Sequence, residues 1–268
     1  MAETGTTTGN ATTAATGPAP APFFGWRDKL AFALAAAVSL AGYWWTVAPS
    51  VTLEDSGEFL TAARHLGVPH PPGYPIWTIL AWVWQGLMPV GNIAWRVNLM
   101  SAVFGAAAVW LAALLISKTG HIMGHRVGYL RGLDERLVDL VVLGSALCGS
   151  LLLAFAPVMW SQSVITEVYS LNAFFLLLTL VYLYRWSFEP ERRWRLYVAA
   201  LVWGVSLTNH QTLVLLTVAL PLYVWLVDRR LGRDLLLPIL AVIAGAIGKM
   251  VLFKGSDSMF YSGPLTGT

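Results

Sequence analysis

Three carboxylates within five residues are the most chemically suggestive feature of the sequence. They are Glu54, Asp55 and Glu58. A carboxylate placed beside a hydroxyl can take its proton as a new bond forms, so the cluster is a candidate for general base chemistry. A structural explanation stands beside this one. The stretch Asp55-Ser56-Gly57-Glu58 has the spacing of a capping box, with Asp55 as the cap of a helix over 56–66.

A proline-rich turn follows the acidic residues. It reads His70-Pro71-Pro72-Gly73-Tyr74-Pro75 and is expected to end the helix over 56–66. Next comes an apolar segment, 76–88, that holds three tryptophans and is too short to cross a hydrocarbon core of about 30 Å. We predict a helix in the membrane interface with its tryptophans as anchors. His65 and His70 are five residues apart across the turn, a poor spacing for a metal, and no metal site is predicted.

Polar residues further along the chain extend the set of candidates. Arg96 binds a substrate phosphate in one interpretation and reaches lipid headgroups in the other. Glu167 stands at the start of an apolar segment, where the helix dipole also favours a carboxylate as a cap. Asn209 and His210 fit a polar loop between two short helices.

The elements that must position these residues are apolar helices. Hydrophobic residues make up 57% of the 268 residues and charged residues 12%, which excludes a soluble enzyme and a disordered protein. The single cysteine, Cys148, excludes an intrachain disulfide. Apolar runs are predicted to span a membrane at 29–48, 99–117, 137–156, 168–185, 195–208, 211–227 and 235–253. Because 195–208 and 211–227 are short, the predicted number of spans is six or seven.

The positions of the basic residues predict the orientation. With the N-terminus in the cytosol, 13 of the 17 Lys and Arg residues lie on the cytosolic side. Membrane topology therefore explains the net charge of +3, and no nucleic-acid partner is predicted. The segment 49–98 becomes a long outer loop. The Thr-, Ala- and Pro-rich residues 1–22 are predicted to be a disordered tail.

Three motifs make the sequence resemble a known family. They are Asp55-Ser56-Gly57-Glu58-Phe59, the Gly-Val-Pro-His-Pro-Pro-Gly-Tyr-Pro stretch at 67–75, and the Arg-Val-Asn-Leu-Met-Ser-Ala stretch at 96–102. Weaker similarities cover 160–172 and 208–212. The chain resembles bacterial members of the membrane protein O-mannosyltransferase-like family, related to the vertebrate enzyme that modifies plexin-type domains. More loosely, it resembles the GT-C class of polytopic glycosyltransferases.

The resemblance implies transfer of a sugar from a polyprenyl-phosphate donor to a hydroxyl acceptor. Mannose is the favoured sugar, and Ser or Thr of a protein is a candidate acceptor. Asp55 matches the family's loop acid and is implied to be the general base, while Arg96 is the candidate for the leaving phosphate. The candidate catalytic residues are Asp55 and Glu58, and the candidate substrate-binding residues are Glu54, His70, Tyr74, Arg96, Glu167, Asn209 and His210. The lipid-linked sugar is the donor substrate, and the sequence leaves open whether a divalent metal is needed as a cofactor.

We therefore expect an all-α, polytopic, GT-C-like domain over 23–268, with the active-site loop at 49–98. Because members of the family continue further, a truncated C-terminus is part of this expectation. The resemblance also implies a bacterial inner membrane with the site facing the periplasm. Two alternatives stay open: a non-catalytic membrane subunit or scaffold, and a transporter. The transporter is disfavoured because charges gather at the ends of the spans and no internal repeat is visible.

Overall fold

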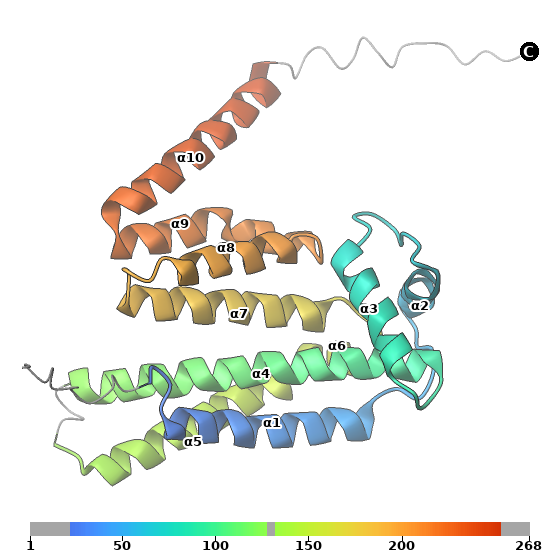
Figure 1. The fold of residues 1–268 in the computed structure, drawn as a ribbon, viewed down its shortest axis with the longest axis horizontal. Helices are drawn as coiled ribbons and strands as arrows, with labels where there is room; N and C mark the ends of the chain where they lie inside the picture. Colours follow the sequence, from blue (N-terminus) through green and yellow to red (C-terminus); the bar gives the residue numbers. More distant parts are fainter. Residues whose placement is uncertain (1–21, 128–131, 253–268) are drawn as a thin grey trace, which may run out of the picture.

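The computed structural model describes residues 22–127 and 132–252, in which the regular structure is helical (Figure 1). The helices are α1 (Trp26–Thr46), α2 (Ser56–His65), α3 (Pro75–Leu87), α4 (Ile93–Arg126), α5 (Glu135–Ala154), α6 (Pro157–Ser163), α7 (Tyr169–Phe188), α8 (Trp194–Ser206), the 3-10 helix η1 (Gln211–Leu215), α9 (Leu216–Val227) and α10 (Arg229–Leu252). The all-α prediction is confirmed for these residues. The predicted N-terminal tail and the end of the chain, 1–21 and 253–268, lie outside them.

Helix α4 is the central element of the bundle. It packs along α1, α5 and α7, and Figure 1 shows it running the length of the molecule. Close approach depends on small residues, because a side chain at Gly105 would collide with Ser163 and Tyr43. Its 34 residues exceed the predicted span of 99–117 at both ends.

Four described helices are long and apolar enough to cross a membrane, which indicates an integral membrane protein. They correspond to Ile93–Gly124, Glu135–Ala154, Tyr169–Phe188 and Arg229–Lys249. Helix α1 has 21 residues but is not among them, because Lys29 and the aromatic residues at its end lower its mean hydropathy. Helices α8 and α9 have only 13 and 12 residues. The helices lie where the sequence predicts them, but the predicted six or seven spans are not confirmed.

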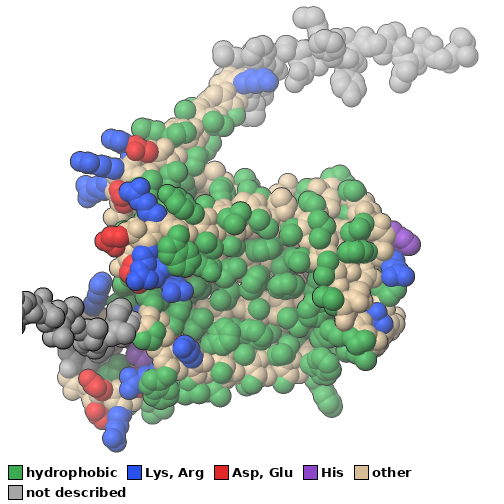
Figure 2. Space-filling model, viewed as in Figure 1, with side chains coloured by type: hydrophobic (Ala, Val, Ile, Leu, Met, Phe, Trp, Pro, Cys, Tyr) green, Lys and Arg blue, Asp and Glu red, His purple; other side chains and the backbone are tan. Residues whose placement is uncertain are grey.

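The short helices α2 and α3 lie together at one end of the bundle and run across it (Figure 1). Phe59 and Trp77 from these helices join Val97 of α4 and Leu171 of α7 in one core cluster. The prediction that the tryptophans of 76–88 anchor in the interface is wrong for Trp77, which is fully buried, while Trp82 is exposed. At the opposite end, Figure 2 shows most of the visible charged side chains.

A buried polar cluster joins α1, α4 and α5 at that charged end. Asp28 is 4% exposed, and its carboxylate accepts hydrogen bonds from Ser117 Oγ at 2.6 Å and from the Gly25 N–H at 2.9 Å. The ring of His121 lies 3.4 Å from both Asp28 and Asp139. One carboxylate thus satisfies polar groups of two helices inside an apolar bundle.

We expect Asp28→Ala to destabilise the bundle, because Ser117 and Gly25 lose a charged acceptor that is out of reach of water. The free energy of unfolding should fall by about 1–3 kcal/mol. The thermal unfolding midpoint of the purified protein in detergent measures the loss. Asp234→Ala, whose carboxylate is 60% exposed, is the matched control and should leave the midpoint unchanged. Equal midpoints for Asp28→Ala and the wild type would contradict this account.

Candidate active site

The start of α2 carries the acidic residues in an open position. Asp55 is the residue before the helix, yet its side chain makes no capping hydrogen bond. Glu54 has φ of 66°, a left-handed conformation that is unusual for a residue with a side chain. Both side chains are exposed. The capping-box interpretation of 55–58 is therefore wrong, and the Asp55 carboxylate is free to face solvent and substrate.

Glu58 binds His70 across the turn instead of its own helix. Its Oε1 accepts the backbone N–H of His70 at 2.6 Å, and its Oε2 lies 3.0 Å from Nδ1 of the ring. The hydrogen bond from the His70 side chain lowers the pKa of Glu58, so this carboxylate is ionised and accepts a hydrogen bond from Nδ1–H. The same bond raises the pKa of His70 above its ordinary value of 6.5. The contact ties α2 to the proline-rich turn, whose Pro71–Pro72 peptide is cis.

The other ring nitrogen of His70 faces two further candidate residues. Its Nε2 lies 3.2 Å from the hydroxyl of Tyr74 and 3.9 Å from Oδ2 of Asp55. Tyr74 is 6% exposed, and burial raises the pKa of its phenol. Its ring stacks on His210, with ring centres 6.0 Å apart and planes at 18°. Residues from three distant segments therefore meet here.

Glu167 lies beneath this cluster, just before α7. Its residue is 4% exposed, and Oε2 accepts the neighbouring N–H of Val168 at 3.3 Å. Burial raises the pKa of Glu167 to about 7, and the negative charges of Glu54 and Asp55 add to the shift. Its backbone carbonyl is fixed by Trp77 Nε1 at 3.2 Å. A carboxyl group that is half-protonated near neutral pH thus stands below the exposed acids.

Sequence reasoning missed the role of Asn98, a fully buried amide in α4. Its Nδ2 donates to the carbonyls of Ala48 and Ser50 at 2.9 and 3.0 Å, and its Oδ1 accepts the hydroxyl of Thr166 at 2.5 Å. Ser56, the first residue of α2, donates to the Thr166 carbonyl at 3.2 Å. One amide therefore joins the start of the outer loop, α4 and the segment before α7. An Asn inside an apolar run is the signal that would have identified it.

The remaining predicted residues occupy different places. Arg96 donates from Nε to the carbonyls of Val90 and Gly91, at 3.1 and 3.0 Å, and from Nη1 to Gln85 at 3.0 Å, so it closes the end of α3. Asn209 is fully buried and donates to the Val168 carbonyl at 3.2 Å.

His210 caps η1 by accepting the Thr212 N–H at 3.2 Å, and burial lowers its pKa. The structure thus brings His210 and Asn209 to the Tyr74–Glu167 side of the cluster, as the contacts of Tyr74 and Val168 show. Their expected polar loop is the turn that joins α8 to η1.

Asp55, Glu58 and His70 are the described group that deserves a test for metal binding. Their potential ligand atoms lie within 4.8 Å of one another. However, Glu58 already holds the ring and the backbone N–H of His70, and an ion bound at Nδ1 would have to break that bond. Because Glu58 and His70 are already hydrogen-bonded to each other, we do not assign metal ligands to this group.

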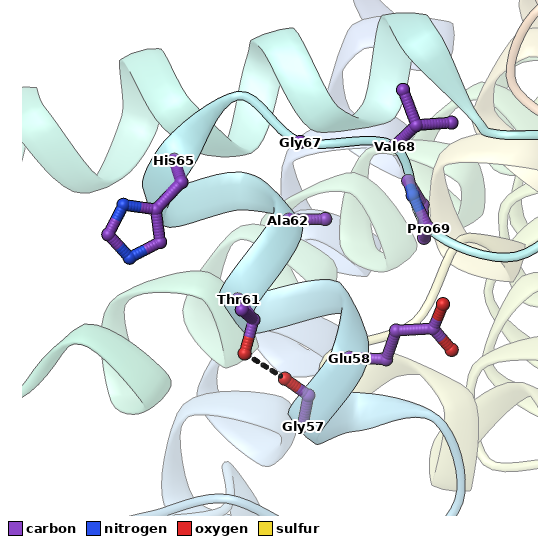
Figure 3. Close-up of a pocket in the computed structure, with 8 residues that line it drawn as sticks. All are labelled: Gly57, Glu58, Thr61, Ala62, His65, Gly67, Val68 and Pro69. Atoms are coloured by element: carbon purple, nitrogen blue, oxygen red, sulfur yellow. Dashed lines mark hydrogen bonds between the residues drawn. The ribbon is translucent and has the colours of Figure 1, made fainter.

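A shallow groove of about 450 Å³ runs along the outer side of α2, beside the cluster (Figure 3). It is lined by Gly57, Glu58, Thr61, Ala62, His65, Gly67, Val68 and Pro69. In Figure 3 the Glu58 carboxylate extends from α2 toward the segment of Val68 and Pro69, whereas His65 lies at the far end of the helix. The acidic cluster is thus open to molecules that approach from outside the bundle.

The fold and the cluster define a helical membrane protein with an acid–histidine site at one end of its bundle. The chain belongs to the family described as the Protein O-mannosyl-transferase TMEM260 N-terminal domain, which matches residues 55–232. This confirms the family resemblance drawn from the motifs.

Two relatives show the extent of the similarity. Protein O-mannosyl-transferase TMEM260 of Mus musculus is 36% identical over 164 residues, which are 60% of this chain and 20% of the relative. Protein O-mannosyl-transferase tmem260 of Dictyostelium discoideum is 30% identical over 209 residues, 72% of this chain and 22% of the relative. The chain therefore spans about a fifth of the length of these relatives. No solved structure matches it.

The buried Glu167 makes the free energy of unfolding of the protein depend on pH. Its pKa is raised from 4.5 to about 7 in the folded protein, so the folded state binds this proton more tightly than the unfolded state does. The contribution of Glu167 to stability is therefore greatest below pH 4.5, falls as the pH rises to about 7, and then stays constant.

We expect the unfolding midpoint of Glu167→Gln to rise relative to that of the wild type as the pH increases through this range. Thermal unfolding in detergent at several pH values measures the difference. Glu135→Gln, which removes an exposed carboxylate at the start of α5, is the control for loss of charge. A constant difference between Glu167→Gln and the wild type would contradict the assignment.

Proposed function

We propose that this chain is a GT-C-type glycosyltransferase domain. It transfers a sugar from a polyprenyl-phosphate donor to a hydroxyl acceptor such as Ser or Thr of a protein, and mannose is the favoured sugar. Membership of a family whose relatives are named protein O-mannosyl-transferases supports the reaction type. The single observation that carries the proposal is the Asp55 carboxylate, exposed and uncapped at the start of α2, within 3.9 Å of His70.

Charge distribution supports the side of the membrane on which the site works. The predicted cytosolic segments hold 13 of the 17 basic residues, and Figure 2 shows charged side chains gathered at the end opposite α2 and α3. We therefore place the cluster on the outer face, the periplasmic face of a bacterial inner membrane. A site at the end of a bundle is suited to a donor whose lipid lies in the bilayer while its sugar phosphate stays among the headgroups.

In the proposed reaction the acceptor oxygen attacks C1 of the sugar as Asp55 takes the hydroxyl proton. The bond between C1 and the phosphate oxygen breaks, and its electron pair stays on the lipid phosphate. Arg96 stays the candidate for that negative charge through Nη2, since Nε and Nη1 hold the end of α3. Glu167, Tyr74 and His210 border the cluster and orient the sugar, while Glu54 borders the opening. The fully buried Asn209 acts from behind them by holding the Val168 carbonyl.

Asp55→Asn tests this function. The amide keeps the shape of the side chain but cannot take a proton, so we expect transfer to fall by about 10²–10⁴-fold with the unfolding midpoint unchanged. The measurement is transfer of mannose from polyprenyl-phosphate-mannose to a membrane-fraction acceptor pool. Asp234→Asn, at the charged end of the bundle, is the control.

Full activity in Asp55→Asn would overturn the assignment of the base. Absence of transfer by folded wild-type protein would instead favour the non-catalytic membrane subunit that the sequence leaves open.

A further inference from the structure

We propose that His70 is the final proton acceptor of the site, and that it receives through Asp55 the proton which the acceptor hydroxyl loses. This inference rests on the proposed function and deepens it. It changes His70 from a substrate-binding residue to a member of a proton relay, Glu58–His70–Asp55. The relay was not visible in the sequence, because Glu58 and His70 are 12 residues apart and a helix and a turn separate them.

Glu58 fixes both the position and the tautomer of the His70 ring. It holds the backbone N–H at 2.6 Å and Nδ1 at 3.0 Å, so two contacts define where the ring lies. The ring also packs against Phe59, with centres 5.5 Å apart, and edge-on against Tyr74 at 5.3 Å. With the proton on Nδ1, Nε2 carries a lone pair, which accepts the Tyr74 hydroxyl in the structure and lies 3.9 Å from Asp55. Such an acid–histidine pair is a familiar way to orient a proton acceptor.

The distance from Nε2 to Asp55 Oδ2, 3.9 Å, is too long for a hydrogen bond, so the relay requires the two side chains to come closer when the substrates bind. Asp55 makes no capping bond that would oppose this movement. Hydrogen bonds of a catalytic site are often long before the substrate binds and shorten in the complex. The hydroxyl of Tyr74, 3.2 Å from Nε2, supplies a partner for this nitrogen while the site is empty.

The charges around His70 favour a proton on its ring. The pKa of His70 is raised above 6.5, first by its bond to Glu58 and then by the charges of Glu58, Asp55 and Glu167, against an opposing effect of burial. These carboxylates and the phenol of Tyr74 face the ring from the start of α2, from the segment before α7 and from the residue before α3. The ring is therefore a suitable final site for the proton that the acceptor hydroxyl loses.

The relay balances the atoms and charges of the transfer. The acceptor oxygen forms a bond to C1 of the sugar, and the bond from C1 to the phosphate oxygen breaks with its electron pair on the lipid phosphate. The hydroxyl proton passes to Asp55 Oδ2 and from there to Nε2 of His70. The imidazolium is then paired with Glu58, and the proton returns to water before the next cycle. Only a neutral His70 can start the reaction.

The pH dependence of transfer tests the relay. We expect the wild-type rate to rise with pH through a midpoint above 6.5 and then to level off. In Glu58→Gln the midpoint should move to lower pH, because the negative charge that raises the pKa of His70 is gone. In His70→Gln this rise should disappear and the plateau rate should fall at least about 10-fold. His65→Gln, which changes a histidine at the far end of α2, should keep the wild-type profile.

Glu167 also titrates near neutral pH, so Glu167→Gln belongs in the same series. The relay predicts that Glu167→Gln keeps the rise, with its midpoint at slightly lower pH. A rise that persists in His70→Gln but disappears in Glu167→Gln would overturn the proposal. So would a wild-type rate that falls as the pH increases, because His70 would then act as a cation beside the phosphate.

Two further measurements do not depend on the pH profile. Nitrogen NMR of histidine-labelled protein in nanodiscs, with His70→Gln for assignment, should show the Nδ1–H tautomer and a lower His70 pKa in Glu58→Gln. The Nε2–H tautomer would overturn the geometry. Transfer should also be unchanged by a chelator, whereas loss that added Mg²⁺ or Mn²⁺ restores would show an ion in place of the relay. If folded wild-type protein transfers at no pH, the proposed function itself fails, but if His70→Gln transfers with the wild-type profile, only the relay fails.

Discussion

The fully buried amide of Asn98 is the constraint on which the arrangement of the site end of the bundle depends. Polar groups inside an apolar bundle must find partners within the protein, and Asn98 satisfies the carbonyls of Ala48 and Ser50 after α1 and one hydroxyl before α7. Through Thr166 the same network reaches Ser56 at the start of α2. Asp55 precedes Ser56 by one residue, so this network also fixes its position relative to the central helix α4. Hydrogen bonds from Asn98 to the backbone carbonyls of Ala48 and Ser50 thus hold the segment between α1 and α2 in place.

Electrostatics within the cluster then divides the carboxyl groups by environment. Glu58 is exposed and bonded to His70, which lowers its pKa, whereas burial raises the pKa of Glu167 to about 7. Asp55 is exposed, and its side chain makes no capping hydrogen bond. The three carboxyl groups therefore differ in their properties. Glu58 is an anion held in place by His70, Glu167 exchanges its proton near pH 7, and Asp55 is free of a capping bond. Such separation of pKa values between neighbouring acids is what acid–base chemistry at neutral pH requires.

The family relationship places this cluster in a wider context. The match to the family's N-terminal domain covers residues 55–232, which include every candidate site residue except Glu54. The chain covers about a fifth of the length of the relatives named protein O-mannosyl-transferases. Helix α10 is nearly uncovered and packs mainly on α9 (Figure 1). The reaction proposed here uses only side chains that the chain itself supplies, together with donor and acceptor.

The sequence by itself determined the helical class, the places of the helices and which residues are candidates for the site. Hydropathy fixes where apolar helices lie, and the motif at 55–59 and the turn at 70–75 lie next to each other in the chain. The tertiary structure alone decided which partners the polar groups chose. Local spacing favoured a capping box between Asp55 and Glu58, yet the turn brings both the backbone N–H and the ring of His70 to the Glu58 carboxylate, at 2.6 and 3.0 Å, so Glu58 makes two bonds there. The burial of Trp77 and the hydrogen-bond network of Asn98 likewise depend on contacts between residues 50 to 90 positions apart, which no local pattern encodes.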